Sequence, residues 1–239
     1  MPKLLRLSII AFLFAFTSDG FKKQQLSYPR VRAAFAAKEQ LLLTDLRKIG
    51  ISESGLKLYL RGFKKERKLE AWVSSGGPFQ LLRTYSFCNF SGVLGPKRRR
   101  GDGQIPEGLY TLDYYNPVSS YLLSMRVSYP NESDKKRTTG SSTGGDIYIH
   151  GGCATIGCIP ITDDKIKELY TLAVMAKDAS GANVPIHIFP FEMTTENMAS
   201  NAGIHSAFWK ELEPFYSAFE RNNRLPKGRI LTDGKYQMQ

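Results

Sequence analysis

The sequence is poor in residues that bind metals or form disulfides, with three cysteines and three histidines among 239 residues. No second Cys/His pair stands at zinc-site spacing, so we expect no metal. The odd number of cysteines leaves at least one thiol free or paired with another molecule. Internal repeats and low-complexity tracts are also absent. A chain of this length can form one sizeable domain with appended elements.

Long apolar runs are equally scarce. One extends from Leu7 to Phe16, after Lys3 and Arg6, and it is too short to cross a bilayer. Residues 1–20 are therefore predicted to be a signal peptide or an uncleaved N-terminal anchor. No cysteine directly follows the run, which argues against lipid attachment, and no other segment reaches transmembrane length. We expect an exported protein of the periplasm or cell envelope, with no integral membrane span.

The chain carries a net charge of +11, and its sharpest basic run is Lys97 to Arg100. Such a charge would suit nucleic acid, but the run stands among glycines and a proline, which predicts a loop rather than a recognition helix. In an exported protein, anionic envelope polymers or a membrane surface explain the charge at least as well. A loop that only keeps the protein soluble is the alternative. We expect no nucleic-acid partner.

Helical spacing is clearest towards the two ends. Residues 31–49 have a helical period that ends at Gly50, so residues 21–54 are predicted to be an N-terminal helical segment. Residues 194–222 carry aromatic side chains at helix-like spacing. These aromatics are typical of a core rather than of a ligand cage. Residues 194–239 are therefore expected to be a C-terminal helical extension that covers a sheet.

Between these ends, residues 55–193 are predicted to form a β domain. Apolar and polar residues alternate from Leu56 to Arg61, as in a half-buried strand. Further strands are predicted at Leu69–Val73, Phe79–Cys88, Leu109–Tyr114, Ser120–Val127, Asp146–His150 and Val184–Phe189. One helix interrupts the strands, with Thr162 as its predicted N-cap and Gly181 at its end. The fold class is thus mainly β with flanking helices (α+β), as a β-sandwich or a partly open barrel.

The stretch from Ile147 to Pro160 is the one best suited to chemistry. It predicts a strand that ends at His150, a loop of small residues, and Cys158 just before a helix. A thiolate attacks carbonyl groups, and His150 can accept the proton of a nearby thiol. The glycines permit close approach of the backbone to a substrate. The amides of Gly157 and Cys158 can stabilise the oxyanion of a tetrahedral intermediate.

Other interpretations of these cysteines stay open. His150, Cys153 and Cys158 could be metal ligands, with a fourth ligand from elsewhere. A disulfide could join Cys153 to Cys158 or Cys88 to Cys153, and the second pairing leaves Cys158 free. Cys158 could also be a buried structural thiol, which would explain neither the glycines nor His150.

These residues resemble the signature of the YkuD-type L,D-transpeptidases, in which His-Gly is followed by Ser/Thr-x-Gly-Cys. The matching positions are His150-Gly151 and Thr155-x-Gly157-Cys158. Further blocks are similar to the YafK-like branch of that family, at residues 91–97, 101–108, 116–121, 129–131 and 187–191. Together they span roughly residues 55–193, so the resemblance is more specific than the short motif alone.

The resemblance implies a mostly β catalytic domain at residues 55–193, with a helix after the catalytic cysteine. It implies that Cys158 is the nucleophile and His150 the general base. Gly151 and Gly157 would shape the cleft, and Thr155 would help to position the histidine. No metal and no other cofactor is implied.

The chain departs from the family at one position. Many members carry Arg two residues after the cysteine, where this chain has Pro160. A clamp for a substrate carboxylate is therefore missing there, and Arg126 or the loop from Lys97 to Arg100 are the candidates to replace it. The candidate substrate-binding residues are Gly152, Tyr129, Asn116, Lys97 and Arg126. His187 is predicted to be structural, and His205 is assigned no function.

The function that follows is that of a cell-wall cysteine L,D-transpeptidase. It would act on peptidoglycan stem peptides through an acyl-enzyme on Cys158, with an amine of another stem or of a wall-attached protein as acceptor. The alternative is a peptidoglycan amidase that uses the same pair to cut cross-links or detach wall-bound proteins. A third hypothesis, a non-catalytic wall-binding module, would leave Cys158 inert and has no need of the pairing with His150.

Overall fold

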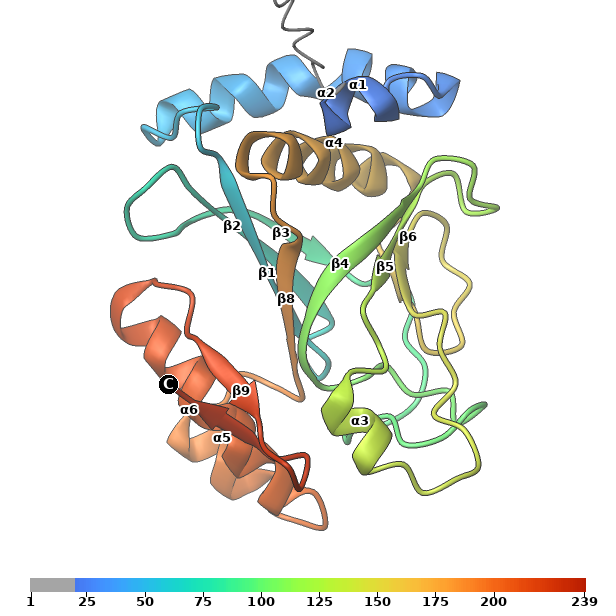
Figure 1. The fold of residues 1–239 in the computed structure, drawn as a ribbon, viewed down its shortest axis with the longest axis vertical. Coiled ribbons are helices and arrows are strands. Elements are labelled where there is room, and N and C mark those ends of the chain that lie inside the picture. Colours follow the sequence, from blue (N-terminus) through green and yellow to red (C-terminus); the bar gives the residue numbers. More distant parts are fainter. Residues whose placement is uncertain (1–19) are drawn as a thin grey trace, which may run out of the picture.

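The computed structural model of the protein describes residues 20–239, which are built around one eight-stranded sheet (Figure 1). The strand order is β3-β2-β1-β8-β4-β5-β6-β7. β1 is parallel to β8 and β6 is parallel to β7, whereas the other neighbours are antiparallel. The strands are β1 (Lys57–Phe63), β2 (Lys68–Ser74), β3 (Gln80–Ser86), β4 (Gly108–Asn116), β5 (Ser124–Val127), β6 (Tyr148–His150), β7 (Ile159–Pro160) and β8 (Val184–Phe189).

Helices flank this sheet, so the mainly β fold with flanking helices is confirmed. They are α1 (Phe21–Gln25), α2 (Pro29–Lys48), α3 (Glu132–Lys136), α4 (Asp163–Ser180), α5 (Thr195–Ser200) and α6 (Ser206–Asn222). Figure 1 shows α1 and α2 lying over α4, with α4 between them and the sheet. α5 and α6 lie at the opposite end of β1 and β8.

The sheet curls into a partly open barrel (Figure 1). Its edge strands are β3 and β7, and two contacts link them at one end. Cys88, just beyond β3, donates its N–H to the carbonyl of Pro160 in β7 (3.0 Å). The same residue forms a disulfide with Cys153 in the loop between β6 and β7, with 5.5 Å between the Cα atoms. Of the two predicted forms, the chain adopts the partly open barrel.

β1 is buried on both faces, although the sequence predicted a half-buried strand. Leu58 lies in the main core, on which α4 packs. On the other face, Tyr59 packs edge-on against Phe219 of α6, with 5.0 Å between ring centroids. Arg61 is 2% exposed, and its guanidinium lies 4.8 Å from the Phe219 ring centroid. The prediction of a solvent-facing side is wrong because the C-terminal helix covers it.

The predicted capping residues of α4 behave differently at its two ends. Thr162 stands at the N-cap position with φ +70° and no capping hydrogen bond from its side chain. The capping role predicted for its hydroxyl is therefore wrong. Gly181 adopts the left-handed conformation (φ +67°), and its N–H bonds to the Lys177 carbonyl. Its predicted role as terminator is confirmed.

The C-terminal extension contains a hairpin that the sequence did not predict. After α6, β9 (Gly228–Ile230) and β10 (Tyr236–Met238) pair antiparallel. Tyr236 is buried, and its hydroxyl accepts a hydrogen bond from the Asn131 side-chain amide (2.7 Å). The extension is therefore not purely helical, and the hairpin fastens it to the loop that precedes α3.

Two other predictions concern the N-terminus and the strand expected at Ser120–Val127. The predicted signal peptide or anchor, residues 1–20, lies outside the described residues except for Gly20. The strand predicted at Ser120–Val127 begins only at Ser124, because the preceding residues form a loop beside the site described below. Within residues 20–239, no helix combines the length and apolar character needed to cross a membrane.

Candidate active site

Cys158 is a free thiol that stands immediately before β7. Its Sγ accepts a hydrogen bond from the Tyr148 N–H (3.4 Å) and faces the Asp146 carbonyl at 3.5 Å. The Cys88–Cys153 disulfide decides between the pairings that the sequence left open. It also removes Cys153 from the possible metal trio, because a metal-binding cysteine must be a thiolate. In the part of the chain that the structure describes, no group of three His, Cys, Asp or Glu is placed to hold a metal ion.

His150 is held in one tautomer by its neighbour. The imidazole is 2% exposed at the end of β6, and its Nδ1 lies 2.5 Å from the Gly151 carbonyl oxygen. A carbonyl only accepts hydrogen bonds, so Nδ1 carries the proton and Nε2 keeps its lone pair. His150 therefore presents the nitrogen that a general base requires.

Burial keeps both groups neutral at rest. It lowers the pKa of His150 below its usual value, and the hydrogen bond to Gly151 only partly opposes this. It raises the pKa of the Cys158 thiol, against the opposing effects of the Tyr148 N–H and the Lys97 charge. At neutral pH the resting pair is a thiol and a neutral imidazole. The thiolate forms when a base takes the proton.

One cavity of about 360 Å³ brings Cys158 and His150 together. The remaining lining residues come from the segment after β4 and from the start of β6: Asn116, Ser119, Ser120, Tyr121, Ser124, Asp146 and Tyr148. The Tyr121 ring covers His150, with 4.5 Å between ring centroids and 31° between the planes. The sequence-predicted pair thus shares a cavity wall with an aromatic side chain that was not predicted to belong to the site.

The loop that carries Tyr121 is held by the N-terminal helix α2. Arg30 donates hydrogen bonds to the carbonyls of Ser119 (2.6 Å) and Leu122 (3.2 Å). Leu122 has φ +67°, a conformation that few side chains adopt without support. The sequence did not predict Tyr121 as a site residue. The one feature that could have indicated it is that Tyr121 lies in residues 116–121, a block similar to the YafK-like branch.

Two of the predicted glycines have a steric reason to be glycine. A Cβ on Gly151 would lie 2.6 Å from Asp163 Oδ1 and 2.7 Å from the Tyr121 carbonyl oxygen. Gly157 has φ +110°, and a Cβ there would lie 2.8 Å from the Gln104 carbonyl oxygen. Both glycines therefore let the loop pass close to neighbouring backbone, as a cleft-shaping role requires.

Two other predicted residues make contacts of a different kind. The Thr155 hydroxyl donates to the Cys158 carbonyl (2.8 Å), a contact that orders the loop of the thiol. The Gly157 N–H donates to Ser91 Oγ (2.7 Å). An oxyanion role for this amide therefore requires the substrate to displace the Ser91 hydroxyl.

Two of the cations considered as replacements for the Arg missing at Pro160, Lys97 and Arg126, are already paired. Lys97 is 4% exposed, and its ammonium lies 2.5 Å from Asp102 Oδ1. Arg126 forms an ion pair with Asp113, with 2.9 Å between Nε and Oδ1. Neither cation is available to a substrate without breaking its ion pair.

The other three predicted substrate-binding residues lie in different surroundings. Asn116 lines the cavity of the thiol. Tyr129 is buried, and its hydroxyl donates to the Thr143 carbonyl (3.0 Å). The Gly152 N–H donates to Asp163 Oδ1 (2.8 Å), which anchors the loop to the start of α4. Of these three, only Asn116 lies in the cavity wall, whereas the other two have contacts that order loops.

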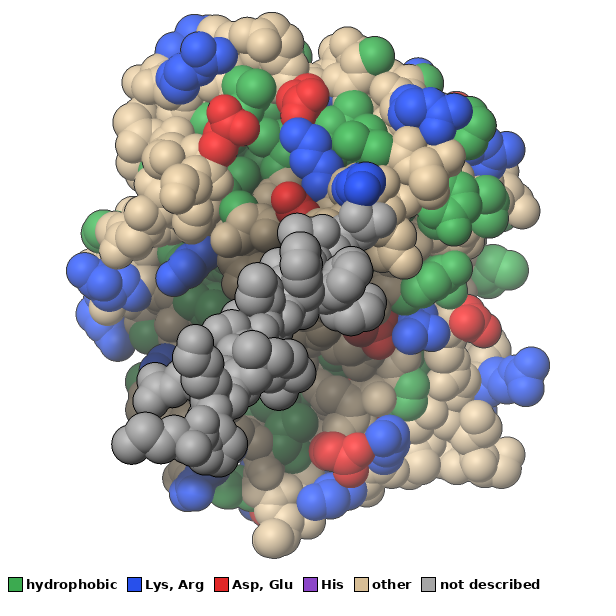
Figure 2. Space-filling model, turned by 45° about the horizontal axis from the view of Figure 1, so that its top comes forward, with side chains coloured by type: hydrophobic (Ala, Val, Ile, Leu, Met, Phe, Trp, Pro, Cys, Tyr) green, Lys and Arg blue, Asp and Glu red, His purple; other side chains and the backbone are tan. Residues whose placement is uncertain are grey.

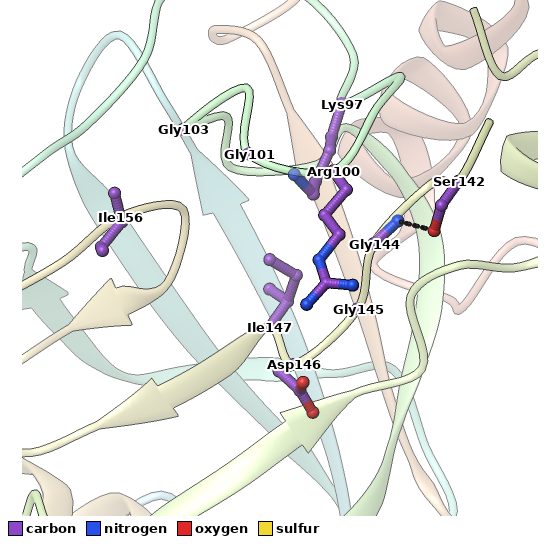
Figure 3. A pocket seen from close by; sticks show the side chains of 10 residues that line it. All are labelled: Lys97, Arg100, Gly101, Gly103, Ser142, Gly144, Gly145, Asp146, Ile147 and Ile156. Atoms are coloured by element: carbon purple, nitrogen blue, oxygen red, sulfur yellow. Dashed lines mark hydrogen bonds between the residues drawn. The ribbon is translucent and has the colours of Figure 1, made fainter. Parts of the chain in front are cut away.

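A second cavity, of about 420 Å³, adjoins the first at Asp146, which lines both (Figure 3). The basic loop and the segment before β6 form most of its walls. The remaining lining residues are Lys97, Arg100, Gly101, Gly103, Ser142, Gly144, Gly145, Ile147 and Ile156.

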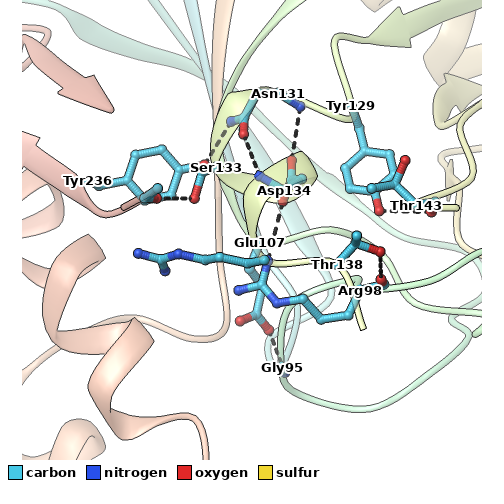
Figure 4. A network of polar contacts seen from close by, with 12 residues as sticks. Gly95, Arg98, Glu107, Tyr129, Asn131, Ser133, Asp134, Thr138, Thr143 and Tyr236 are labelled. Carbon is cyan, nitrogen blue, oxygen red and sulfur yellow. Dashed lines mark hydrogen bonds and ion pairs between the residues drawn. The ribbon is translucent and has the colours of Figure 1, made fainter. Parts of the chain in front are cut away.

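A buried polar network around Asp134 supports these loops (Figure 4). Asp134 accepts hydrogen bonds from the Asn131 N–H (3.1 Å) and the Tyr110 hydroxyl (3.0 Å). The guanidinium of Arg98 lies 3.6 Å from its other carboxylate oxygen, and the Arg98 carbonyl accepts from the Thr138 hydroxyl (2.7 Å). Burial raises the pKa of Asp134 to about 6. The network joins the two loops that form the walls of the second cavity.

The remaining histidines stand apart from this site. His187 is 5% exposed, with its Nδ1 2.8 Å from the Tyr59 hydroxyl oxygen. Burial, reinforced by the Arg61 charge, lowers the pKa of His187 to about 3. These are the contacts of a structural histidine. His205 is at the N-cap position of α6 and lines neither of the two cavities.

Comparison with known proteins identifies the family of the chain. Residues 51–188, more than half of the chain, match the model of the YkuD family, described as the L,D-transpeptidase catalytic domain. The chain therefore belongs to the L,D-transpeptidase family, which supports an enzyme that acts on peptidoglycan. It is 34% identical over 185 residues to the protein named "Putative L,D-transpeptidase YafK" of Escherichia coli strain K12, covering 76% of this chain and 74% of that relative.

The solved structures that match this chain share less sequence with it. The helical cell shape determining protein Pgp2 from Campylobacter jejuni has 18% identity and a TM-score of 0.47, with 80% of each chain covered. This chain spans 62% of the length of a mutant form of that protein. L,D-transpeptidase 1 of Mycobacterium tuberculosis has 15% identity and a TM-score of 0.32, with 56% of this chain and 62% of that chain covered.

Proposed function

We propose that this chain is a cysteine acyltransferase that acts on peptidoglycan stem peptides through an acyl-enzyme on Cys158. One observation carries the proposal: the free thiol lines the same cavity as a histidine whose Nε2 has a lone pair. Membership of the L,D-transpeptidase family supplies the substrate class. A binding module would need neither a free thiol nor an oriented base.

In the first half of the reaction, His150 Nε2 takes the proton of the Cys158 thiol, and the sulfur attacks a stem-peptide carbonyl carbon. A C–S bond forms while the amide C–N bond breaks. His150 returns its proton to the departing amine, which leaves as terminal D-Ala. The products are a thioester on Cys158 and a neutral imidazole, so protons and electrons balance.

In the second half, an acceptor amine attacks the thioester and loses a proton to His150. The C–S bond breaks, a new amide bond forms, and the proton returns to the sulfur. Water in place of the amine would make the same protein an amidase that cuts cross-links or detaches wall-bound proteins. No metal and no organic cofactor is needed for either outcome.

The tetrahedral intermediates carry a negative oxygen that needs donors. The backbone N–H groups of Cys158 and Gly157 are the proposed donors to this oxygen. The Gly157 N–H can donate to it only after the substrate displaces Ser91 Oγ. Tyr121 acts as a positioning residue, because its ring limits the orientations open to the His150 imidazole. Burial leaves His150 neutral, so the base is ready for proton transfer at neutral pH.

The test is the intact mass of the protein after incubation with tetrapeptide muropeptides. The parent chain should gain an acyl adduct, and Cys158→Ala should gain none. His150→Gln should keep a thiol that reacts with iodoacetamide but should form the adduct at least about a hundredfold more slowly. His205→Gln, which alters a histidine outside the site, is the matched control. Turnover by Cys158→Ala would show that the nucleophile is wrongly assigned.

The products decide between an amine and water as acceptor. Mass spectrometry of defined muropeptides should reveal new amide bonds, between two stems or to an amine of a wall-attached protein. Shortened or detached stems without new bonds would instead identify an amidase.

We also propose that the protein works in the periplasm or cell envelope, where stem peptides occur. The Cys88–Cys153 disulfide supports this proposal, since structural disulfides persist in oxidising compartments. Fractionation of cells that carry the full chain, with a thiol label to report the disulfide, tests it. Finding the protein reduced in the cytosolic fraction would contradict it.

A further inference from the structure

Half of the net charge of residues 20–239 lies in the layer that α1 and α2 form. The whole chain carries +11, residues 1–19 contribute +1 of this, and residues 20–239 therefore carry +10. Residues 21–50 contain seven Lys or Arg and two Asp or Glu, a net charge of +5. Figure 2 brings this end of the molecule forward and shows Lys and Arg side chains on its surface, with hydrophobic side chains between them. A charge so concentrated on one layer favours an extended anionic surface as its partner.

The exposed side of α2 carries cations and no acid. Arg32 and Arg47 are exposed, Leu41 is 47% exposed, and three alanines between Arg32 and Leu41 are exposed as well. The two acids of the helix, Glu39 and Asp45, are half-buried. Each forms an ion pair with a lysine, at 2.5 and 2.8 Å between Nζ and the carboxylate oxygen. An anionic surface that approaches this side of α2 therefore meets no unpaired carboxylate of the helix.

No carboxylate neutralises the arginines of α2. Arg32 donates to two carbonyls of the turn between α1 and α2 (3.0 and 2.8 Å), and Arg47 donates to the Leu43 carbonyl (3.0 Å). Arg30 donates to the two loop carbonyls described above. Within residues 20–239, none of these three guanidinium groups forms an ion pair. A hydrogen bond to a neutral carbonyl leaves the positive charge in place, so all three can attract an anion.

The sequence that precedes α1 is itself suited to a membrane. Its apolar run extends from Leu7 to Phe16, and only residues 17–20 stand between this run and Phe21, the first residue of α1. The five backbone steps from Phe16 to Phe21 span at most about 18 Å. A bilayer that holds the run therefore lies within reach of the layer that α1 and α2 form.

We propose that the exposed side of α1 and α2 docks on an anionic lipid bilayer. Arg32 and Arg47 lie among the headgroup phosphates, and Leu41 enters the interface beside them, as in helices that lie flat on membranes. An anionic wall polymer would also attract the arginines, but it would gain nothing from Leu41 or from the apolar run. The docking surface does not depend on the proposed function, because it contains neither the thiol nor the histidine.

In the docked orientation, the candidate active site lies beside the bilayer. Ser119 lines the cavity that contains Cys158, and its carbonyl accepts the hydrogen bond from Arg30 (2.6 Å). The cavity wall is therefore in direct contact with α2, whereas α5 and α6 lie at the opposite end of β1 and β8 (Figure 1). Combined with the proposed function, this contact would place the reaction at stem peptides on the membrane-facing side of the wall.

The test is flotation of the full chain with vesicles of phosphatidylglycerol and phosphatidylcholine in equal parts, and with vesicles of phosphatidylcholine alone. The parent should bind the anionic vesicles more tightly, and added salt should weaken that binding. Arg32→Gln with Arg47→Gln should bind them about thirtyfold more weakly, because each cation near an anionic surface is worth about fivefold in affinity. Lys210→Gln with Arg229→Gln removes two exposed cations from α6 and β9 and should bind as the parent does. Leu41→Gln should bind about fivefold more weakly at every salt concentration.

Equal binding by the α2 pair and the C-terminal pair of variants would overturn the proposal, as would a parent that binds both kinds of vesicle alike. Pelleting with purified sacculi is the second arm, and a loss with sacculi but not with vesicles would identify a wall polymer as the partner instead. Arg32→Lys with Arg47→Lys keeps both charges and should bind as the parent does, whereas weak binding would show that folding rather than charge is responsible. Cys158→Ala should float like the parent, so this result and the proposed function can fail independently.

Discussion

Removal of the Cys88–Cys153 disulfide should destabilise the protein without removing its proposed nucleophile, Cys158. The change to make is Cys88→Ser together with Cys153→Ser, because either replacement alone would leave a second free thiol able to pair with Cys158. The double variant keeps Cys158 as its one thiol. It also keeps the Cys88 backbone, whose N–H bonds to the Pro160 carbonyl.

The size of the loss follows from the length of chain that the disulfide encloses. The two cysteines are 65 residues apart in the sequence. A crosslink over a loop of this length lowers the entropy of the unfolded chain by an amount worth roughly 4 kcal/mol. In a protein of this size, that corresponds to a fall in Tm of roughly 8 to 16 °C.

Urea unfolding of the parent and of the double variant, followed by near-UV circular dichroism, measures the difference. The parent in a reducing buffer is the matched control, and it should lose the same amount. The loss should also be independent of Cys158→Ala. A difference below about 1 kcal/mol would refute the reasoning, since the edges β3 and β7 would then be held together by their other contacts.

Three further predictions concern the site and its supports. Gly157→Ala should slow acyl-enzyme formation and cost roughly 1–3 kcal/mol of stability, because a Cβ meets the Gln104 carbonyl at 2.8 Å. Gly77→Ala, with nothing within 4 Å and outside both cavities, should be silent in both assays. Asp134, with its pKa raised to about 6 by burial, holds a proton in the folded state that the unfolded chain releases near pH 4. The unfolding free energy should therefore fall by roughly 3 kcal/mol as pH rises across that window, and Asp134→Asn should flatten the slope in urea titrations. Iodoacetamide alkylation of Cys158 should rise through a midpoint above the usual thiol pKa of about 8.5, and a midpoint below pH 7 would contradict a neutral resting pair.

What the sequence predicts correctly is mostly local. The strand that ends at His150 and the glycine that ends α4 depend on patterns within a few residues of each other. The alternation in β1 was also detected, but its burial was not. The helix that covers its second face lies more than a hundred residues further along the chain, beyond the reach of any periodicity.

Contacts between distant segments explain the rest. Tyr121 covers His150 because a loop after β4 folds across the end of β6. The charge of Arg126 is cancelled across the β4–β5 pair by Asp113, so a cation that looks available in the sequence is not. Thr162 is the one local prediction that is wrong. Threonine is typical of an N-cap, but here it adopts a positive φ and its hydroxyl forms no capping hydrogen bond.

The hold of Arg30 on the Tyr121 loop has a consequence for where the catalytic unit begins. The family match starts at residue 51, and the change in hydrophobic period starts at residue 55. A truncated chain that began at either point would lose the guanidinium that ties down the Ser119 and Leu122 carbonyls, although it would keep every residue of the signature. We expect the truncated chain to turn over slowly, because the Tyr121 ring would no longer hold the His150 imidazole in place. We therefore expect the smallest working version of this protein to include α2.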